Sequence, residues 1–91
     1  MSHKTIVPMR LEQHESEKLM SRAQAKRVAQ QFERFNEVVL DFEGVAEVGP
    51  AFADELLRVF AAAHPAVRLV PINMSQAVAQ MVRRAISAGE R

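Results

Sequence analysis

The sequence predicts an α/β domain whose strands and helices alternate in the order β-α-β-α-β-α. Short apolar runs rich in β-branched residues recur at residues 5–11, 38–42 and 67–72, and a segment with helical spacing of apolar residues follows each run. The chain has 91 residues, 48% hydrophobic and 25% charged, which is typical of one globular domain over residues 1–91. Such alternation favours a small, mainly parallel or mixed sheet flanked by helices.

The first strand, residues 5–11, contains Pro8, which cannot donate to a strand ladder. We therefore expect it at an edge of the sheet, where a second copy of the chain could pair with it to form a homodimer. Residues 13–18 are polar and predict a loop.

A helix is predicted over residues 21–35. Ser21 followed by Gln24 is typical of a capping box at a helix N-terminus. The apolar stripe of this helix consists of Ala25, Val28, Ala29, Phe32 and Phe35.

The run at residues 38–42 is short and apolar, which favours a strand covered on both faces. A loop over residues 43–49 follows it. Pro50 then opens a second helix, because proline is tolerated at the first helical position, and His64 ends it. The expected buried stripe is Phe52, Leu56, Val59, Phe60 and Ala63.

The third strand is expected at residues 67–72, and a last helix should follow, capped by Asn73 or Ser75. Gly89 is a plausible end for this helix. Its apolar stripe is Val78, Met81, Val82, Ala85 and Ile86.

The formal net charge of +1 hides an uneven distribution. Residues 36–57 hold six acids and no lysine or arginine, whereas residues 18–35 and 58–91 are basic. This pattern favours a charged protein partner over general binding of polyanions, because the acidic stretch repels phosphates. Charge runs are equally typical of solvated faces.

Asp54, Glu55 and Arg58 form a polar stripe on an otherwise apolar helix. Their spacing lets either acid pair with the guanidinium group, so a self-paired solvent face is one interpretation and a contact patch is another. Acid–base catalysis is the least favoured, since adjacent helical residues point about 100° apart.

Three other polar groups have competing interpretations. Asp41 lies within a strand and should brace the following loop, because a buried carboxylate needs hydrogen bonds. Lys18, Arg22 and Lys26 share a helical spacing and indicate a solvated basic face or a partner contact. Nucleic-acid binding by this face is not expected, because no aromatic side chain lies on it.

The segment at residues 38–60 resembles the central motif of STAS domains, the fold of anti-sigma factor antagonists. It is closer still to a small STAS-like family of unknown function, and residues 21–27 and 71–73 also resemble that family. The residues that carry the likeness are Gly49, Ala51, Phe52, Ala53, Asp54, Glu55 and Arg58.

This resemblance implies a non-enzymatic regulatory protein–protein interaction module, bound by an ATPase that is similar to histidine kinases. Antagonists are switched by phosphorylation of a serine at the start of the helix after the central strand. Gly49, Pro50 and Ala51 occupy that place here, and none can accept a phosphoryl group.

We therefore expect partner contacts around the loop at 43–49 and the following helix, with no catalytic residue, phosphorylation site, metal or cofactor. The expected contact residues are Glu43, Glu47, Gly49, Pro50, Asp54, Glu55, Arg58 and Asn73. The alternative is a small ligand-binding domain or enzyme that uses Asp54, Glu55 and Arg58. The absence of cysteine favours the cytoplasm, and no uncharged stretch reaches the ~20 residues of a membrane span.

Overall fold

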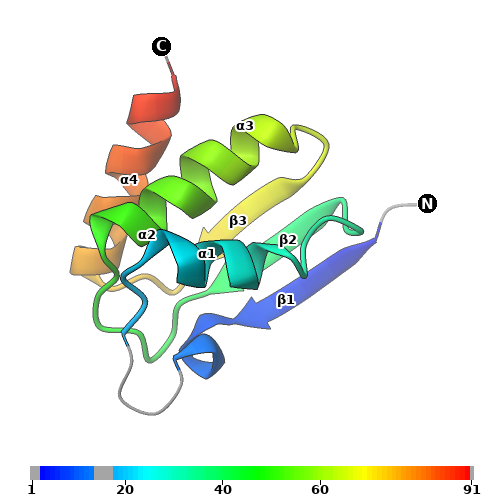
Figure 1. The fold of residues 1–91 in the computed structure, drawn as a ribbon. Coiled ribbons are helices and arrows are strands. Elements are labelled where there is room, and N and C mark those ends of the chain that lie inside the picture. Colours follow the sequence, from blue (N-terminus) through cyan, green and yellow to red (C-terminus); the bar gives the residue numbers. More distant parts are fainter. Residues whose placement is uncertain (1–2, 14–17, 91) are drawn as a thin grey trace.

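The computed structural model describes residues 3–13 and 18–90. Three strands form one parallel sheet in the order β1-β2-β3, and helices alternate with them (Figure 1). The strands are β1 (Lys4–Pro8), β2 (Glu37–Asp41) and β3 (Arg68–Ile72), and the longer helices are α1 (Arg22–Ala29) and α4 (Gln76–Gly89). The structure confirms the α/β class and the predicted order of elements.

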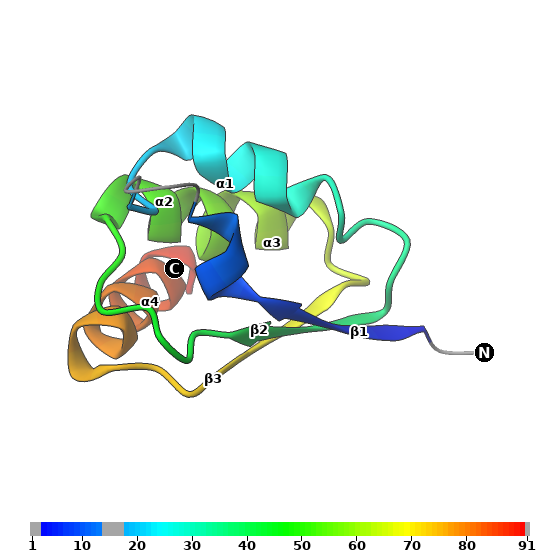
Figure 2. The ribbon, with the colours of Figure 1, turned by 90° about the horizontal axis from the view of Figure 1, so that it is seen from below.

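The helices lie on one face of the sheet, as Figure 2 shows. Right-handed crossovers between strands laid side by side in sequence order place successive helices on the same side. The expectation that β2 is covered on both faces holds for its side chains, since Val38, Val39 and Leu40 are all buried, but helices cover only one of the two faces (Figure 2). Val39 shares the open face with its register partners Ile6 and Val70. It is nevertheless only 7% exposed, so a central strand can be apolar throughout without a second helical layer.

The first strand is shorter than predicted. It ends at Pro8, and a 3-10 helix, η1 (Met9–Glu12), replaces residues 9–11 of the expected strand. Met9 is fully buried in this turn, which shows that an apolar residue there serves the core rather than a ladder. β1 is an edge strand as expected, and of the predicted loop at 13–18, residues 14–17 lie outside the described residues.

The first helix begins as predicted but ends early. Ser21 and Gln24 form the expected capping box. After α1 the backbone tightens, because Phe32 donates to the carbonyl of Ala29 three residues back. This tighter turn still places Phe32 in the core, fully buried. The predicted helix to residue 35 is thus a helix followed by short turns.

The second helix runs from Pro50 to Ala63 with a π-helical segment inside it. Its parts are α2 (Pro50–Asp54), η2 (Glu55–Phe60) and α3 (Ala61–Ala63). The wider π turns shift the buried stripe to a spacing of four residues. Val59, expected in the core, is consequently half-buried, and Glu55 is only 8% exposed.

The last helix is capped by Ser75, whose hydroxyl oxygen accepts from the Val78 N–H at 3.1 Å. Asn73, the other expected cap, has a left-handed backbone (φ 54°) and serves a different purpose described below. Val78, Val82 and Ala85 are buried as predicted, whereas Ile86 is 38% exposed. Among the residues that the structure describes, no helix is long and apolar enough to cross a bilayer.

A close approach between two backbone segments positions the start of α2. Gly49 caps this helix, and its N–H donates to the Leu19 carbonyl at 2.9 Å. A β-carbon at Gly49 would lie 2.8 Å from Met20 Sδ and 2.9 Å from the Met20 carbonyl oxygen. Glycine is therefore required here by contact rather than by backbone angles.

We expect Gly49→Ala to lower the free energy of unfolding by about 1–3 kcal/mol, because the Met20 backbone must move to admit the methyl group. Urea denaturation measures this change. Gly89→Ala is the control, since its β-carbon would meet only Arg58 Cγ at 3.4 Å. Equal stability of the two variants would contradict the close approach.

Candidate functional site

The expected contact residues fall into two groups joined by the segment that leads into α2. Glu43 and Asn73 follow β2 and β3 at the carboxyl edge of the sheet. Asp54, Glu55 and Arg58 lie further along, on the helix that packs against α1. Parallel sheets commonly bind ligands at the carboxyl ends of their strands, so the first group occupies a favoured position.

The first group is organised by Asp41. Its Oδ1 accepts from the Glu43 N–H at 3.0 Å and from Asn73 Nδ2 at 3.1 Å. These two bonds, the backbone donor first, hold the pKa of the Asp41 carboxyl below its usual value. The prediction that Asp41 braces the following loop is confirmed, and the bond to Asn73 extends the brace to the next strand end.

A shallow groove of about 580 Å³ lies between residues 42–46 and residues 73–75. Ser75 Oγ donates to the Ala46 carbonyl at 2.8 Å and so ties the two sides together. Gly44 turns the loop with a left-handed backbone (φ 83°). Glu43 is exposed on this groove, and in the described part of the chain it makes no ion pair.

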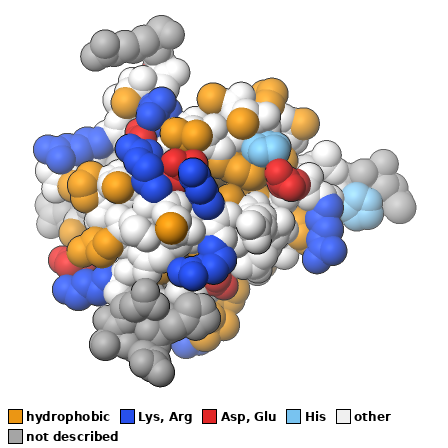
Figure 3. All heavy atoms as spheres, in the orientation of Figure 1, with side chains coloured by type: hydrophobic (Ala, Val, Ile, Leu, Met, Phe, Trp, Pro, Cys, Tyr) orange, Lys and Arg blue, Asp and Glu red, His pale blue; other side chains and the backbone are white. Residues whose placement is uncertain are grey.

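The second group is a network centred on Asp54. Arg58 donates to both oxygens of Asp54, with Nη2 2.8 Å from Oδ2. Arg22 reaches across from α1, and its Nη1 lies 2.7 Å from Asp54 Oδ2 and 3.4 Å from Glu55 Oε1. Figure 3 shows blue guanidinium groups gathered around red carboxylates on this face.

The hydrogen bonds from Arg58 and Arg22, in that order, hold the pKa of Asp54 far below its usual range. The bond to Asp54 likewise raises the pKa of each arginine. Asp54 is therefore ionised and fully engaged at neutral pH, and it has no proton to donate. Such an arrangement fixes helices together and is poorly suited to general acid–base catalysis.

No sequence pattern indicated that Arg22 belongs to this network, since 32 residues separate it from Asp54. A similar long-range pair joins Lys18 Nζ to Glu47 at 3.0 Å. Of the predicted basic helical face, Lys18 lies before α1 and not on it, and both Lys18 and Arg22 are paired with acids of the stretch at 36–57. Glu37 is paired in the same way, with Lys4 at 3.4 Å.

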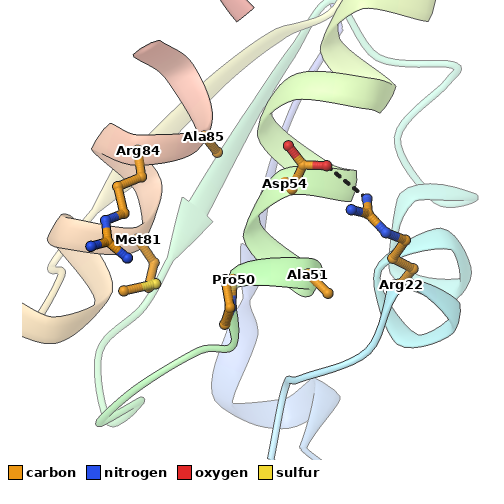
Figure 4. A pocket seen from close by; sticks show the side chains of 7 residues that line it. All are labelled: Arg22, Pro50, Ala51, Asp54, Met81, Arg84 and Ala85. Atoms are coloured by element: carbon orange, nitrogen blue, oxygen red, sulfur yellow. Dashed lines mark hydrogen bonds and ion pairs between the residues drawn. The ribbon is translucent and has the colours of Figure 1, made fainter. Parts of the chain in front are cut away.

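A second cavity, of about 400 Å³, lies over the first turns of α2 between α1 and α4 (Figure 4). Arg22 and Asp54 line it, as expected from the network above. Met81 and Arg84 join them from α4, and the sequence analysis assigned no function to either residue. Among the described residues, no group of three histidines or acids could hold a metal ion.

The family of this chain follows from a comparison with protein-family models. The model of a STAS-like domain of unknown function matches residues 24–79, which is more than half of the chain, and the protein belongs to that family. No curated protein and no solved structure matches the chain. The match includes the groove, strands β2 and β3, and Asp54, Glu55 and Arg58, whereas Arg22 and β1 lie before it.

We expect Asp54→Asn to lower the thermal midpoint at pH 7, because two arginines lose their ionised acceptor. Folding lowers the pKa of Asp54. The ionised carboxylate therefore stabilises the fold in full above its unfolded-state pKa of ~4, and this stabilisation is lost as the pH falls further. The difference in thermal midpoint between Asp54→Asn and the wild type should therefore narrow below about pH 4.

Thermal unfolding followed by circular dichroism between pH 3 and pH 7 measures this convergence. Glu43→Gln is the matched control and should leave the midpoint unchanged, since Glu43 makes no ion pair within the described residues. A difference for Asp54→Asn that stays constant with pH would contradict the charge network.

Proposed function

We propose that the protein is a non-enzymatic regulatory module that binds a protein partner through the groove at the carboxyl ends of β2 and β3. The observation that carries this proposal is the state of Glu43. Within residues 36–57 it is the one acid, of those described, whose side chain has neither an ion pair nor a hydrogen bond. An exposed, uncompensated carboxylate on a braced loop is suited to a basic partner surface.

The other expected contact residues would contribute in different ways. Asn73 lines the groove, is exposed and could contact the partner directly. Glu47 and Pro50 are exposed on the segment that leads from the groove into α2, and Pro50 lines the other cavity. Gly49 and Glu55 are buried, so they would position the surface rather than touch it. Asp54 and Arg58 would keep the helix below the surface rigid.

The proposed partner is a signalling protein, such as an ATPase similar to histidine kinases, and the proposed setting is the cytoplasm. The STAS-like family and the resemblance to anti-sigma antagonists support this class of partner. The start of α2 carries Gly49, Pro50 and Ala51, so binding would not be controlled by a phosphorylated serine at that point. The alternative enzyme that uses Asp54, Glu55 and Arg58 is disfavoured, because these groups are paired with one another and with Arg22.

We expect Glu43→Lys to weaken partner binding at least about tenfold, because it reverses the one free charge of the groove. The partner is obtained by affinity capture from the native host, and its affinity for the purified chain is then measured by calorimetry. Glu90→Lys makes the same charge change at the exposed end of α4 and should leave the affinity unchanged.

Two results would count against the proposal. Equal affinity of Glu43→Lys and the wild type would exclude the groove as the contact surface. If the captured protein has no ATP-binding domain, the chain would still be a binding module, but the proposed class of partner would be excluded.

A second copy of the chain is a further proposed partner, through the free edge of β1. This strand pairs on one side only; Ile6 within it and Leu11 in the following η1 are 59% and 57% exposed. Unpaired strand edges recruit other strands, and the middle of β1, residues 5–7, carries neither a charge nor a proline to prevent it.

If this edge forms a dimer, Ile6→Lys should shift the chain to monomer in sedimentation velocity, because it places a charge at the centre of the paired edge. Arg83→Glu makes a charge change at an exposed position on α4, outside the sheet, and should leave the distribution unchanged. A wild-type chain that sediments as a monomer at all concentrations would rule out the dimer.

A further inference from the structure

We propose that the cavity between α1, α2 and α4 binds a small, singly charged carboxylate that carries a short apolar chain. Arg84 would pair with the carboxylate, and the apolar chain would lie against Met81 and Pro50. This site is separate from the groove at the strand ends. A negative result for the proposed partner surface would therefore not contradict it, and a negative result here would not contradict the partner surface.

The charges that line the cavity define the charge of the ligand. Arg22 and Asp54 neutralise each other across 2.7 Å. Arg84 is exposed on α4, and within the described residues it has neither an ion pair nor a side-chain hydrogen bond. The lining therefore has one excess positive charge, which a monoanion compensates.

The geometry of the guanidinium group favours a carboxylate. A planar guanidinium presents two parallel N–H donors that match the two oxygens of a carboxylate. A doubly charged phosphate monoester would bring a second negative charge toward Asp54, which the arginines keep ionised. The cavity should thus prefer the carboxylate over the phosphate.

The remaining lining is apolar and supplies the second half of the recognition. In Figure 4, Pro50 and Ala51 lie on α2 in the centre, Met81 and Arg84 lie on α4, and Arg22 points in from the opposite side. A half-buried methionine adapts its shape to an aliphatic chain at little cost. The volume of about 400 Å³ falls within the range of small-molecule sites.

The test is a titration of the full chain, labelled at its methionine methyl groups, with hexanoate, followed by nuclear magnetic resonance. The Met81 signal should shift and saturate, with a dissociation constant on the order of 1 mM for so small a ligand. Met9, which is fully buried, and Met74, which lines the other groove, report on any effect elsewhere. The Met9 and Met74 signals should not shift.

Arg84→Ala should weaken hexanoate binding at least about fivefold, since the charged donor is lost. Arg83→Ala removes the neighbouring exposed arginine, which does not line this cavity, and should bind hexanoate as the wild type does. Hexylamine and hexyl phosphate carry an alkyl chain that is one methylene longer, and both should nevertheless bind more weakly than hexanoate.

The proposal is overturned if Met81 does not respond, or if the methionine signals drift together without saturation. It is also overturned if Arg84→Ala and Arg83→Ala bind hexanoate equally. Equal binding of hexylamine would show that the cavity recognises only the apolar chain, which likewise rejects the assigned role of Arg84. Both substitutions are at exposed positions, and the dispersion of the amide spectrum checks that each variant is folded.

Discussion

The contact between the chain entering α1 and the chain entering α2 is the interaction on which the rest of the structure depends. Leu19 accepts a backbone hydrogen bond from Gly49, and Met20 leaves no room for a β-carbon at that position. A few residues further along each segment, Arg22 at the start of α1 pairs with Asp54 at the end of α2. The junction fixes where the helix at Pro50 begins, and it thereby fixes both the groove at the strand ends and the cavity above α2.

This junction also changes what the charge pattern means. An isolated stretch of six acids would present a strongly negative surface, but basic residues from α1 and from the strands neutralise most of it. Among the described residues, Glu43 at the groove and Arg84 at the cavity are the charged lining side chains that neighbouring groups leave unpaired.

Membership of a STAS-like family of unknown function is consistent with a site whose charged groups are mostly paired with one another. The start of α2 holds Gly49, Pro50 and Ala51, so the region that antagonists phosphorylate has become a tightly packed helix cap. Asp54 and Glu55, the acids next to it, are occupied by arginines. No serine or threonine stands at this helix start, and fixed contacts to the backbone before α1 hold it instead.

The order of elements, the capping box at Ser21, the proline that opens α2 and the bracing of the loop by Asp41 were all predictable, because each depends chiefly on neighbours in sequence. The premise for Asp41 was wrong, since its carboxylate is only half-buried. Three features were not predictable. The open face of the sheet follows from strand order, the burial of Glu55 follows from a π segment that local spacing does not reveal, and the role of Arg22 depends on a partner 32 residues away. Sequence determined the local elements, since short-range sterics and hydrogen bonds decide them. Only the tertiary structure decided which charges remain free, because charge compensation depends on distances between elements that no linear pattern encodes.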